Sequence, residues 1–393
     1  MLRLFDPRRD WHQLLRNPIG SSDLTRGWCT YDDNSSDRAD ASLPHFSIDH
    51  DLADVLPLTK LARQLNPQLT LMINAWSPPA WMTSSGSLVA GAVLPENYAR
   101  HANYHVKTIQ AYEPHGLHVN YVSLNNEPTC CPSINYPSIL LITSSQMATM
   151  LKDYWFPAFK ANHLTPKILL LDFNWGKRRF GRTVMTDEAI RTSPFVGALP
   201  GTGAAATQPC SRECTTYAEK TNSSPNAQAS TVAAASERHH MRDLVNVIRN
   251  WGKSFVKGPV AVDEPNGPNR GGCDTCRELV TVHTNNARAG QVDYTIEYSS
   301  MGQFTKFVPN GAHRIDCTAN SQKRSPGNWG AGTKYPSAIL NVAFQNPDGS
   351  LVLIACNDTT APQTFKVVWH GQSFSYSLPV NSQHQCDLPV EIG

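Results

Sequence analysis

Strand-like and helix-like segments alternate along most of this chain, from Leu15 to about Val308. Residues 51–65 carry apolar side chains at helical spacing, and the apolar run 69–73 follows them. Such alternation is typical of a parallel sheet whose strands are joined by helices. No GxGxxG turn follows any strand-like run, so the pattern favours a (β/α)8 TIM barrel over a doubly wound sheet. The other barrel strands are expected at 119–124, 167–172 and 260–262, and the other helices at 95–112, 144–161, 240–251 and 295–307.

The pattern changes after Pro309, where short runs of alternating polar and apolar residues are separated by turn signals such as Asn346-Pro347-Asp348-Gly349. This alternation is typical of an antiparallel β-sandwich. The sequence therefore predicts two domains, a TIM barrel over 1–310 and a C-terminal sandwich over 311–393. The sandwich strands are expected at 338–345, 351–357, 363–370 and 372–378.

Bulk properties exclude several classes of function. The 393 residues carry a net charge of +2, and only 17% are charged, so nothing predicts binding to nucleic acid. No run of 18 apolar residues predicts a transmembrane helix, and the first ten residues lack the apolar core of a signal peptide. The pair Cys273 and Cys276 has the spacing of a zinc or redox site but no second pair accompanies it, so a local disulfide or two buried thiols are expected instead of metal.

An ionisable side chain stands where the run Val119–Leu124 ends, in the tetrapeptide Asn125-Asn126-Glu127-Pro128. Catalytic groups of parallel barrels lie at the carboxyl ends of the strands, so Glu127 is the foremost candidate for chemistry. The preceding strand ends in a segment that contains Trp76 and Trp81, and we expect both indoles beside that carboxylate. A carboxylic acid next to tryptophan rings indicates chemistry on a sugar.

Several segments together resemble glycoside hydrolase family 30, which includes glucosylceramidases and endo-β-1,6-glucanases. The resemblance covers roughly residues 14–197 and 237–380. Its motifs lie at 46–51, 76–82, 126–128, 250–251, 263–269, 302–307 and 341–349.

The resemblance implies retaining hydrolysis by two carboxylates about 5 Å apart, one acting as acid/base and one as nucleophile. It identifies Glu127 as the acid/base and Asn126 as the partner of the sugar 2-hydroxyl. It also assigns Asp23 to sugar hydroxyls and Trp76 to a wall of the glucose pocket. Plainer alternatives are a core role for Trp76, a turn or cap role for Asp23 and a surface ion pair for Glu127. No metal or organic cofactor is implied.

The nucleophile expected from the resemblance is not identifiable. It belongs within Ala198–Ser236, a stretch rich in Ala, Thr and Ser that has neither helical nor strand periodicity. Residues 222–228 can be encoded so that another reading frame gives Phe-Phe-Thr-Glu-Cys-Thr-Gly, which places the nucleophile's codon across Pro225 and Asn226. The sequence therefore predicts a pair of compensating frameshifts over about 198–236. The family's first barrel strand and the first strands of its sandwich also lack counterparts, so we expect an incomplete barrel that is open at one seam.

These observations predict a retaining β-glycoside hydrolase of the glucosylceramidase type, with endo-β-1,6-glucanase as the alternative. Its substrate is then glucosylceramide or a β-1,6-glucan. Two further alternatives stay open: an inactive fragment or sugar-binding pseudoenzyme, and an enzyme that uses another carboxylate such as Glu213 or Glu219. The family implies a monomer in an extracellular location, although this chain shows no signal peptide.

Overall fold

The computed structural model describes most of the chain, and every structural statement below concerns its described residues. They are 1–8, 12–34, 36, 40–128, 135–139, 143–170, 172, 178–197, 216–219, 240–241, 244–245, 248–249, 254–272, 276, 278–318, 339–357, 359 and 361–379.

The first half of the barrel is a parallel sheet in the order β1-β2-β3-β4. Its strands are β1 (Leu14–Ile19), β2 (Thr70–Ala75), β3 (Tyr121–Ser123) and β4 (Lys167–Leu169). In this register Asn74 of β2 lies opposite Pro18 of β1 on one side and Ser123 of β3 on the other. Strands β2, β3 and β4 lie where the sequence predicts them, and the parallel order confirms the expected α/β class.

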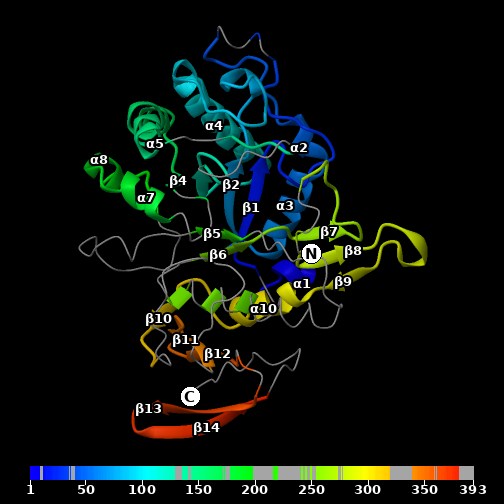
Figure 1. Ribbon diagram of the computed structural model, residues 1–393, viewed down its shortest axis with the longest axis vertical. Coiled ribbons are helices and arrows are strands. Elements are labelled where there is room, and N and C mark those ends of the chain that lie inside the picture. The colour runs from blue at the N-terminus through cyan, green and yellow to red at the C-terminus, as the bar shows by residue number, and fades with distance from the viewer. Residues whose placement is uncertain are drawn as a thin grey trace.

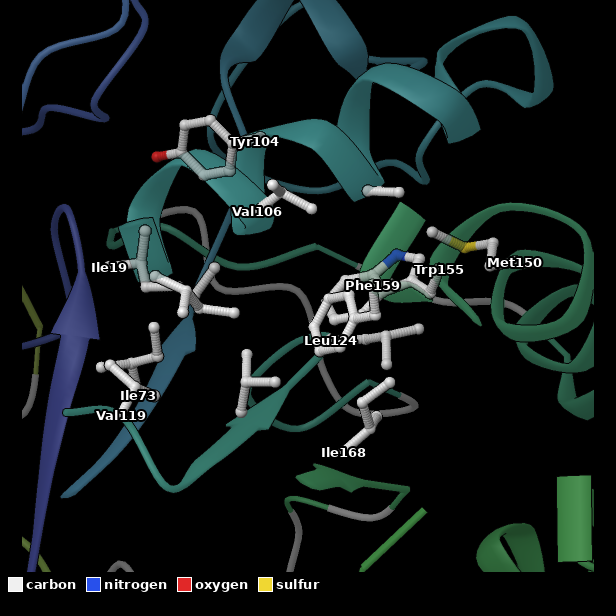
Figure 2. Close-up of a cluster of buried hydrophobic side chains, with 14 of the residues drawn as sticks. Ile19, Ile73, Tyr104, Val106, Val119, Leu124, Met150, Trp155, Phe159 and Ile168 are labelled. Carbon is white, nitrogen blue, oxygen red and sulfur yellow. The ribbon is translucent and has the colours of Figure 1, made fainter. Parts of the chain in front are cut away.

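One face of this sheet packs against helices. Ile19, Ile73, Val122 and Ile168 belong to one buried cluster with helical side chains such as Trp155, and Figure 2 shows part of this packing. The helices concerned follow the strands in the chain, and Figure 1 shows them around the outside of the sheet. They are α2 (Asp49–Ala53), α3 (Val55–Leu65), α4 (Tyr98–Tyr112), α5 (Ser144–Thr149) and α6 (Phe156–Ala161).

The opposite face carries the side chains that alternate with this set, because successive residues of a strand point to opposite faces. Towards the amino ends of the strands this face is apolar, and Met72, Tyr121 and Leu169 form one small cluster there. Asn74 and Ser123 lie on the same face, two residues nearer the carboxyl ends than Met72 and Tyr121, while Arg16 of β1 is paired with Met72. The barrel interior therefore changes from apolar to polar towards the edge where barrel active sites form.

The later barrel strands form separate small sheets. Strands β5 (Thr216–Glu219) and β6 (Ser254–Lys257) pair in parallel, as do β7 (Ala261–Asp263) and β8 (Val280–Val282). Strand β9 (Val292–Tyr294) pairs antiparallel with β8. Within the described ranges no ladder joins these sheets to β1–β4.

The C-terminal domain has the predicted antiparallel strands. Strands β11 (Ile339–Gln345) and β12 (Leu351–Asn357) pair with a third strand, β10 (His313–Ile315), while β13 (Gln363–Trp369) and β14 (Gln372–Leu378) form a hairpin. The strands from β11 to β14 match the expected positions to within one residue, whereas β10 is not foreseen.

A second apolar cluster joins the two domains. Helix α10 (Ile296–Thr305) lies between the barrel strands and the β10–β12 sheet (Figure 1), and the ring of Phe304 meets that of Phe344 at 6.4 Å. Met241, Leu244 and Val342 belong to the same buried cluster. The sandwich is therefore packed on the barrel by apolar side chains from both.

Some predicted helices are interrupted. The helix expected at 51–65 starts at Asp49 and breaks at Asp54. The helix expected at 144–161 contains a π-helical segment, Met150–Trp155, directly before Pro157. Proline has no N–H and its ring crowds the carbonyl four residues earlier, so a regular α-helix cannot pass through this point unchanged. The shorter helical segments are α1 (Leu2–Phe5), η2 (Ala80–Met82), η3 (Pro95–Asn97), η4 (Glu113–His115), α7 (Arg178–Val184), α8 (Glu188–Arg191) and η7 (Asn286–Arg288).

Candidate active site

The backbone around Glu127 is held between two neighbouring strands. The Asn126 N–H donates to the carbonyl of Ala75 at 2.7 Å, and the Glu127 N–H donates to the carbonyl of Asp172 at 2.8 Å. Glu127 has a φ of +49°, which non-glycine residues adopt at a cost of about 1–3 kcal/mol. Such backbone strain is typical of functional sites, and the half-buried Glu127 stands at the expected edge of the sheet.

Arg16 organises the polar side chains next to Glu127, although no sequence motif marks it. Its Nη2 donates to Asn126 Oδ1 at 2.7 Å and to Asp172 Oδ2 at 2.9 Å. Ser123 Oγ donates to the same Asp172 oxygen at 2.7 Å. The guanidinium thereby fixes the carboxamide of Asn126 with its oxygen towards β1, which leaves the amide NH2 to donate elsewhere.

Trp76 lies under the same guanidinium, with Arg16 Cζ 4.7 Å from its ring centroid. Its side chain is 6% exposed, and its Nε1 has no hydrogen-bond partner among the described residues. Trp81 lies elsewhere, because it is buried in the helix-facing cluster and donates its Nε1–H to the carbonyl of Asp32 at 3.0 Å. The expectation of two indoles beside Glu127 is therefore wrong for Trp81, which is a core residue.

Asn74 also belongs to the polar part of the barrel interior. Its side chain is fully buried, and neither Oδ1 nor Nδ2 has a partner within the described part of the chain. More than nine-tenths of buried polar groups in proteins are hydrogen-bonded, so an unpaired buried amide at this edge indicates a missing partner. The available sequence signal was a polar residue in the strand segment that ends in Trp76.

Asp23 lies in a tightly held loop after β1. Ser21 ties the ends of this loop together, since its N–H donates to the carbonyl of Cys29 at 3.0 Å and its Oγ donates to the carbonyl of Gly27 at 3.0 Å. A Cβ placed on Gly272 would lie 1.8 Å from the Asp23 carbonyl oxygen, so the loop after β7 runs directly over this residue. Asp23 is 5% exposed.

The expected nucleophile positions, Pro225 and Asn226, lie outside the described residues, as do Glu213 and most of the stretch around them. Two other carboxylates follow barrel strands, and both already have partners. Asp172 is fully buried between Ser123 and Arg16. Glu264 accepts the backbone N–H of Thr284 and faces His283, and these hydrogen bonds lower its pKa to about 2.

The described residues contain no group of three or more His, Cys, Asp or Glu side chains placed to hold a metal ion. Cys276 is disulfide-bonded, while Cys273 lies outside the described residues. No helix in the described part of the chain is both long enough and apolar enough to span a bilayer.

A parallel barrel that carries a strained glutamate at the end of one strand, together with a C-terminal sandwich, defines a glycoside hydrolase of the barrel-plus-sandwich class. The family follows from comparison with known proteins. Residues 7–243 match the glycosyl hydrolase family 30 TIM-barrel domain, and residues 311–384 match the glycosyl hydrolase family 30 beta sandwich domain. The chain belongs to glycosyl hydrolase family 30, as the sequence motifs indicate.

Curated relatives of two kinds match nearly the whole chain. An endo-1,6-β-D-glucanase of Trichoderma harzianum is 28% identical over 96% of this chain and 76% of its own length. An endo-1,6-β-D-glucanase of Aspergillus fumigatus is 27% identical over 98% and 79%. A putative glucosylceramidase of Caenorhabditis elegans is 25% identical over 88% and 66%.

Solved structures show the same fold. The SrfJ protein of Salmonella typhimurium superposes with a TM-score of 0.78 at 19% identity, over 97% of this chain and 82% of its own. An endo-β1,6-glucanase superposes with a TM-score of 0.73 at 20% identity, over 96% and 84%. The barrel-plus-sandwich architecture is therefore shared with these proteins.

Proposed function

We propose that this chain acts on β-1,6-linked glucan, with Glu127 as the general acid/base at the glucosidic bond. The placement of Glu127 carries this proposal. Its backbone is hydrogen-bonded to the strands on both sides, and its positive φ holds the carboxylate at the edge of the sheet. A purely structural surface acid has no need of such a conformation.

Unpaired buried donors next to Glu127 support a sugar as the ligand. Trp76 Nε1 and the amide of Asn74 have no partner among the described residues, and a pyranose presents hydroxyl oxygens that accept such donors. We assign the free NH2 of Asn126 to the sugar 2-hydroxyl, where a hydrogen bond strengthens as the transition state forms. Asp23 accepts hydroxyl protons in the same pocket.

The choice of glucan over glucosylceramide rests on the relatives. Those that match most of this chain at 27–28% identity are endo-1,6-β-glucanases, whereas the glucosylceramidase relative is 25% identical and matches a smaller share. The glucosylceramidase type, which the sequence analysis preferred, becomes the alternative within the same family.

A second candidate function is glucan binding without turnover. The observation that favours it is the identity of Pro225 and Asn226, which stand where the family's attacking carboxylate is expected. Proline and asparagine cannot form the covalent glycosyl-enzyme of a retaining mechanism. General acid help from Glu127 alone contributes on the order of 10²- to 10⁴-fold.

Hydrolysis of β-1,6-glucan by the full chain, compared with Glu127→Gln, tests the proposal. We expect reducing ends to appear with the unaltered chain and to fall by about 10²-fold or more in the variant. Bound glucan without reducing ends from either protein would favour the second candidate. Failure of both proteins to bind or cleave β-1,6-glucan, with turnover of glucosylceramide, would refute the choice of substrate.

Azide separates the two candidates more sharply. With dinitrophenyl β-glucoside, azide can attack C1 while the C1–O bond breaks and its electron pair leaves with the phenolate. If the chain lacks a nucleophile, added azide accelerates this reaction and yields the glucosyl azide of inverted configuration. If a carboxylate of the chain attacks first, azide intercepts the glycosyl-enzyme and the product retains its configuration.

We also propose an extracellular location. Disulfides persist in oxidising compartments, and Cys276 is disulfide-bonded. Detection of the chain in the culture medium of its source, compared with the cell lysate, tests this assignment, and retention in the lysate would contradict it.

A further inference from the structure

An exposed tryptophan stands on the Asp23 loop, beside the proposed glucose pocket. Trp28 is 37% exposed. Among the described residues of loops 20–31 and 264–272, no other large apolar side chain is as exposed. Tryptophan faces are good partners for the C–H groups of a pyranose ring, because they are broad and apolar.

The backbone on both sides of Trp28 is fixed. The carbonyl of Gly27 and the N–H of Cys29 both bond Ser21 Oγ, at 3.0 Å and 2.6 Å. Gly20 lies against the same segment, since a Cβ placed there would lie 2.7 Å from the Cys29 carbonyl oxygen. Trp28 therefore lies on a loop whose backbone is held by hydrogen bonds, and Asp23 lies in the same loop.

Arg270 approaches Trp28 from the loop after β7, with its Cζ 5.5 Å from the indole ring. This second loop is also held internally, because Gly267 N–H and carbonyl both bond Asp263. Gly271 lies against Asn135, in the segment after Glu127, and Gly272 lies against Asp23. The β7 loop thus contacts both Asp23 and the segment after Glu127, and it brings a guanidinium over the ring of Trp28.

We propose that Trp28 and Arg270 form an outer subsite that binds a further glucose residue of a β-glucan chain. The indole stacks on the pyranose face and the guanidinium donates to its hydroxyls. This inference rests on the proposed function and names the part of the substrate beyond the cleaved glucose. An acyl chain is a poorer occupant, because the described neighbours of Trp28 on these loops include exposed Arg26 and Arg270, not a continuous apolar surface.

Binding measurements with β-1,6-linked glucose oligosaccharides of increasing length test the subsite. Full-length Glu127→Gln protein is used throughout so that turnover does not interfere. We expect the tetrasaccharide to bind about tenfold more tightly than phenyl β-glucoside, and Trp28→Ala to abolish this gain while leaving phenyl β-glucoside binding unchanged. Arg270→Met should lose part of the gain.

Trp369→Ala is the matched control, since Trp369 is 38% exposed on the β13–β14 hairpin of the sandwich. It should leave every affinity unchanged. Equal weakening of phenyl β-glucoside and tetrasaccharide in Trp28→Ala would overturn the subsite and assign Trp28 to support of the Asp23 loop. Unchanged length dependence in that variant would also overturn it.

The remaining outcomes distinguish the subsite from the proposed function. If glucosylceramide micelles bind more tightly than phenyl β-glucoside and Trp28→Ala removes that gain, Trp28 contacts lipid and the glucan subsite is refuted. If no β-glucoside binds the unaltered pocket, the proposed function itself fails. Binding of phenyl β-glucoside without any gain from chain length would refute the subsite alone.

Discussion

Arg16 Nη2 lies 2.9 Å from Asp172 Oδ2, and this ion pair is removed from water, with side-chain exposures of 11% and 0%. Removing one partner of a buried pair leaves the other charge uncompensated, at a cost of about 3–5 kcal/mol. We therefore expect Asp172→Asn to lower the free energy of unfolding by about 3 kcal/mol, measured by urea denaturation.

Asp187→Asn provides the comparison, because Asp187 pairs with Lys152 at the surface, with exposures of 27% and 35%. Asparagine also keeps the N-cap of α8, which the Asp187 side chain supplies. Loss of this surface pair should cost much less than loss of the buried pair, because water screens exposed charges. Equal effects of the two substitutions would contradict the role assigned to the Arg16–Asp172 pair.

Gly272 allows the β7 loop to rest on Asp23. Because a Cβ would lie 1.8 Å from the Asp23 carbonyl oxygen, Gly272→Ala has to displace one of the two loops. We expect it to weaken binding of phenyl β-glucoside by about tenfold or more, measured by calorimetry. Gly27→Ala, in the Asp23 loop but with nothing within 4 Å of the added Cβ, should leave the affinity unchanged. Similar affinities for both variants would show that Asp23 does not depend on this contact.

The interpretation of residues 198–236 as frameshifted makes a prediction about the gene. The codons for residues 222–228 should read Phe-Phe-Thr-Glu-Cys-Thr-Gly when displaced by two nucleotides, with the glutamate codon across Pro225 and Asn226. Sequencing of the genomic DNA and of the transcript checks this directly. Codons that do not give this reading would remove the frameshift interpretation and leave the absence of the nucleophile as a property of the protein.

The sequence was most informative where the local pattern and the tertiary environment agree. The sandwich strands from β11 to β14 were predicted to within one residue, because each alternates and ends at a turn. Strand β10 was missed because, unlike the equally short β3 and β4, it does not lie within a longer apolar run. Pro157 predicts an interruption of the helix at 144–161. The π-helical form of that interruption depends on the packing around Trp155, which the sequence does not show.

The site was predictable only in part. Glu127 and Asn126 follow a strand and have a recognisable motif, so sequence reasoning found them, although their chemical roles stay predictions. Arg16 was missed because its partners, Asn126 and Asp172, lie 110 and 156 residues further along the chain. Trp81 was placed at the site because its motif adjoins Trp76, but only the fold shows that its indole turns into the core.

Two histidines buried in helix α4 predict a loss of stability in acid. His101 and His105 are fully buried, with ring centroids 4.6 Å apart, and they pack against Trp155. Burial lowers the pKa of His105 to about 4, and it lowers the pKa of His101 well below its ordinary value. Between about pH 6.5 and pH 4 the unfolded chain therefore binds a proton at His105 that the folded chain does not.

The stabilising effect of the neutral histidine is fully present above pH 6.5 and is lost as the pH falls towards 4. We expect His105 alone to lower the free energy of unfolding by about 2–3 kcal/mol between pH 7.5 and 4.5, measured by urea denaturation at both values. His105→Phe keeps an aromatic ring that does not titrate, so it should reduce the pH dependence by that amount. An unchanged difference between the two pH values in His105→Phe would show that His105 is already protonated in the folded protein or does not titrate in this range.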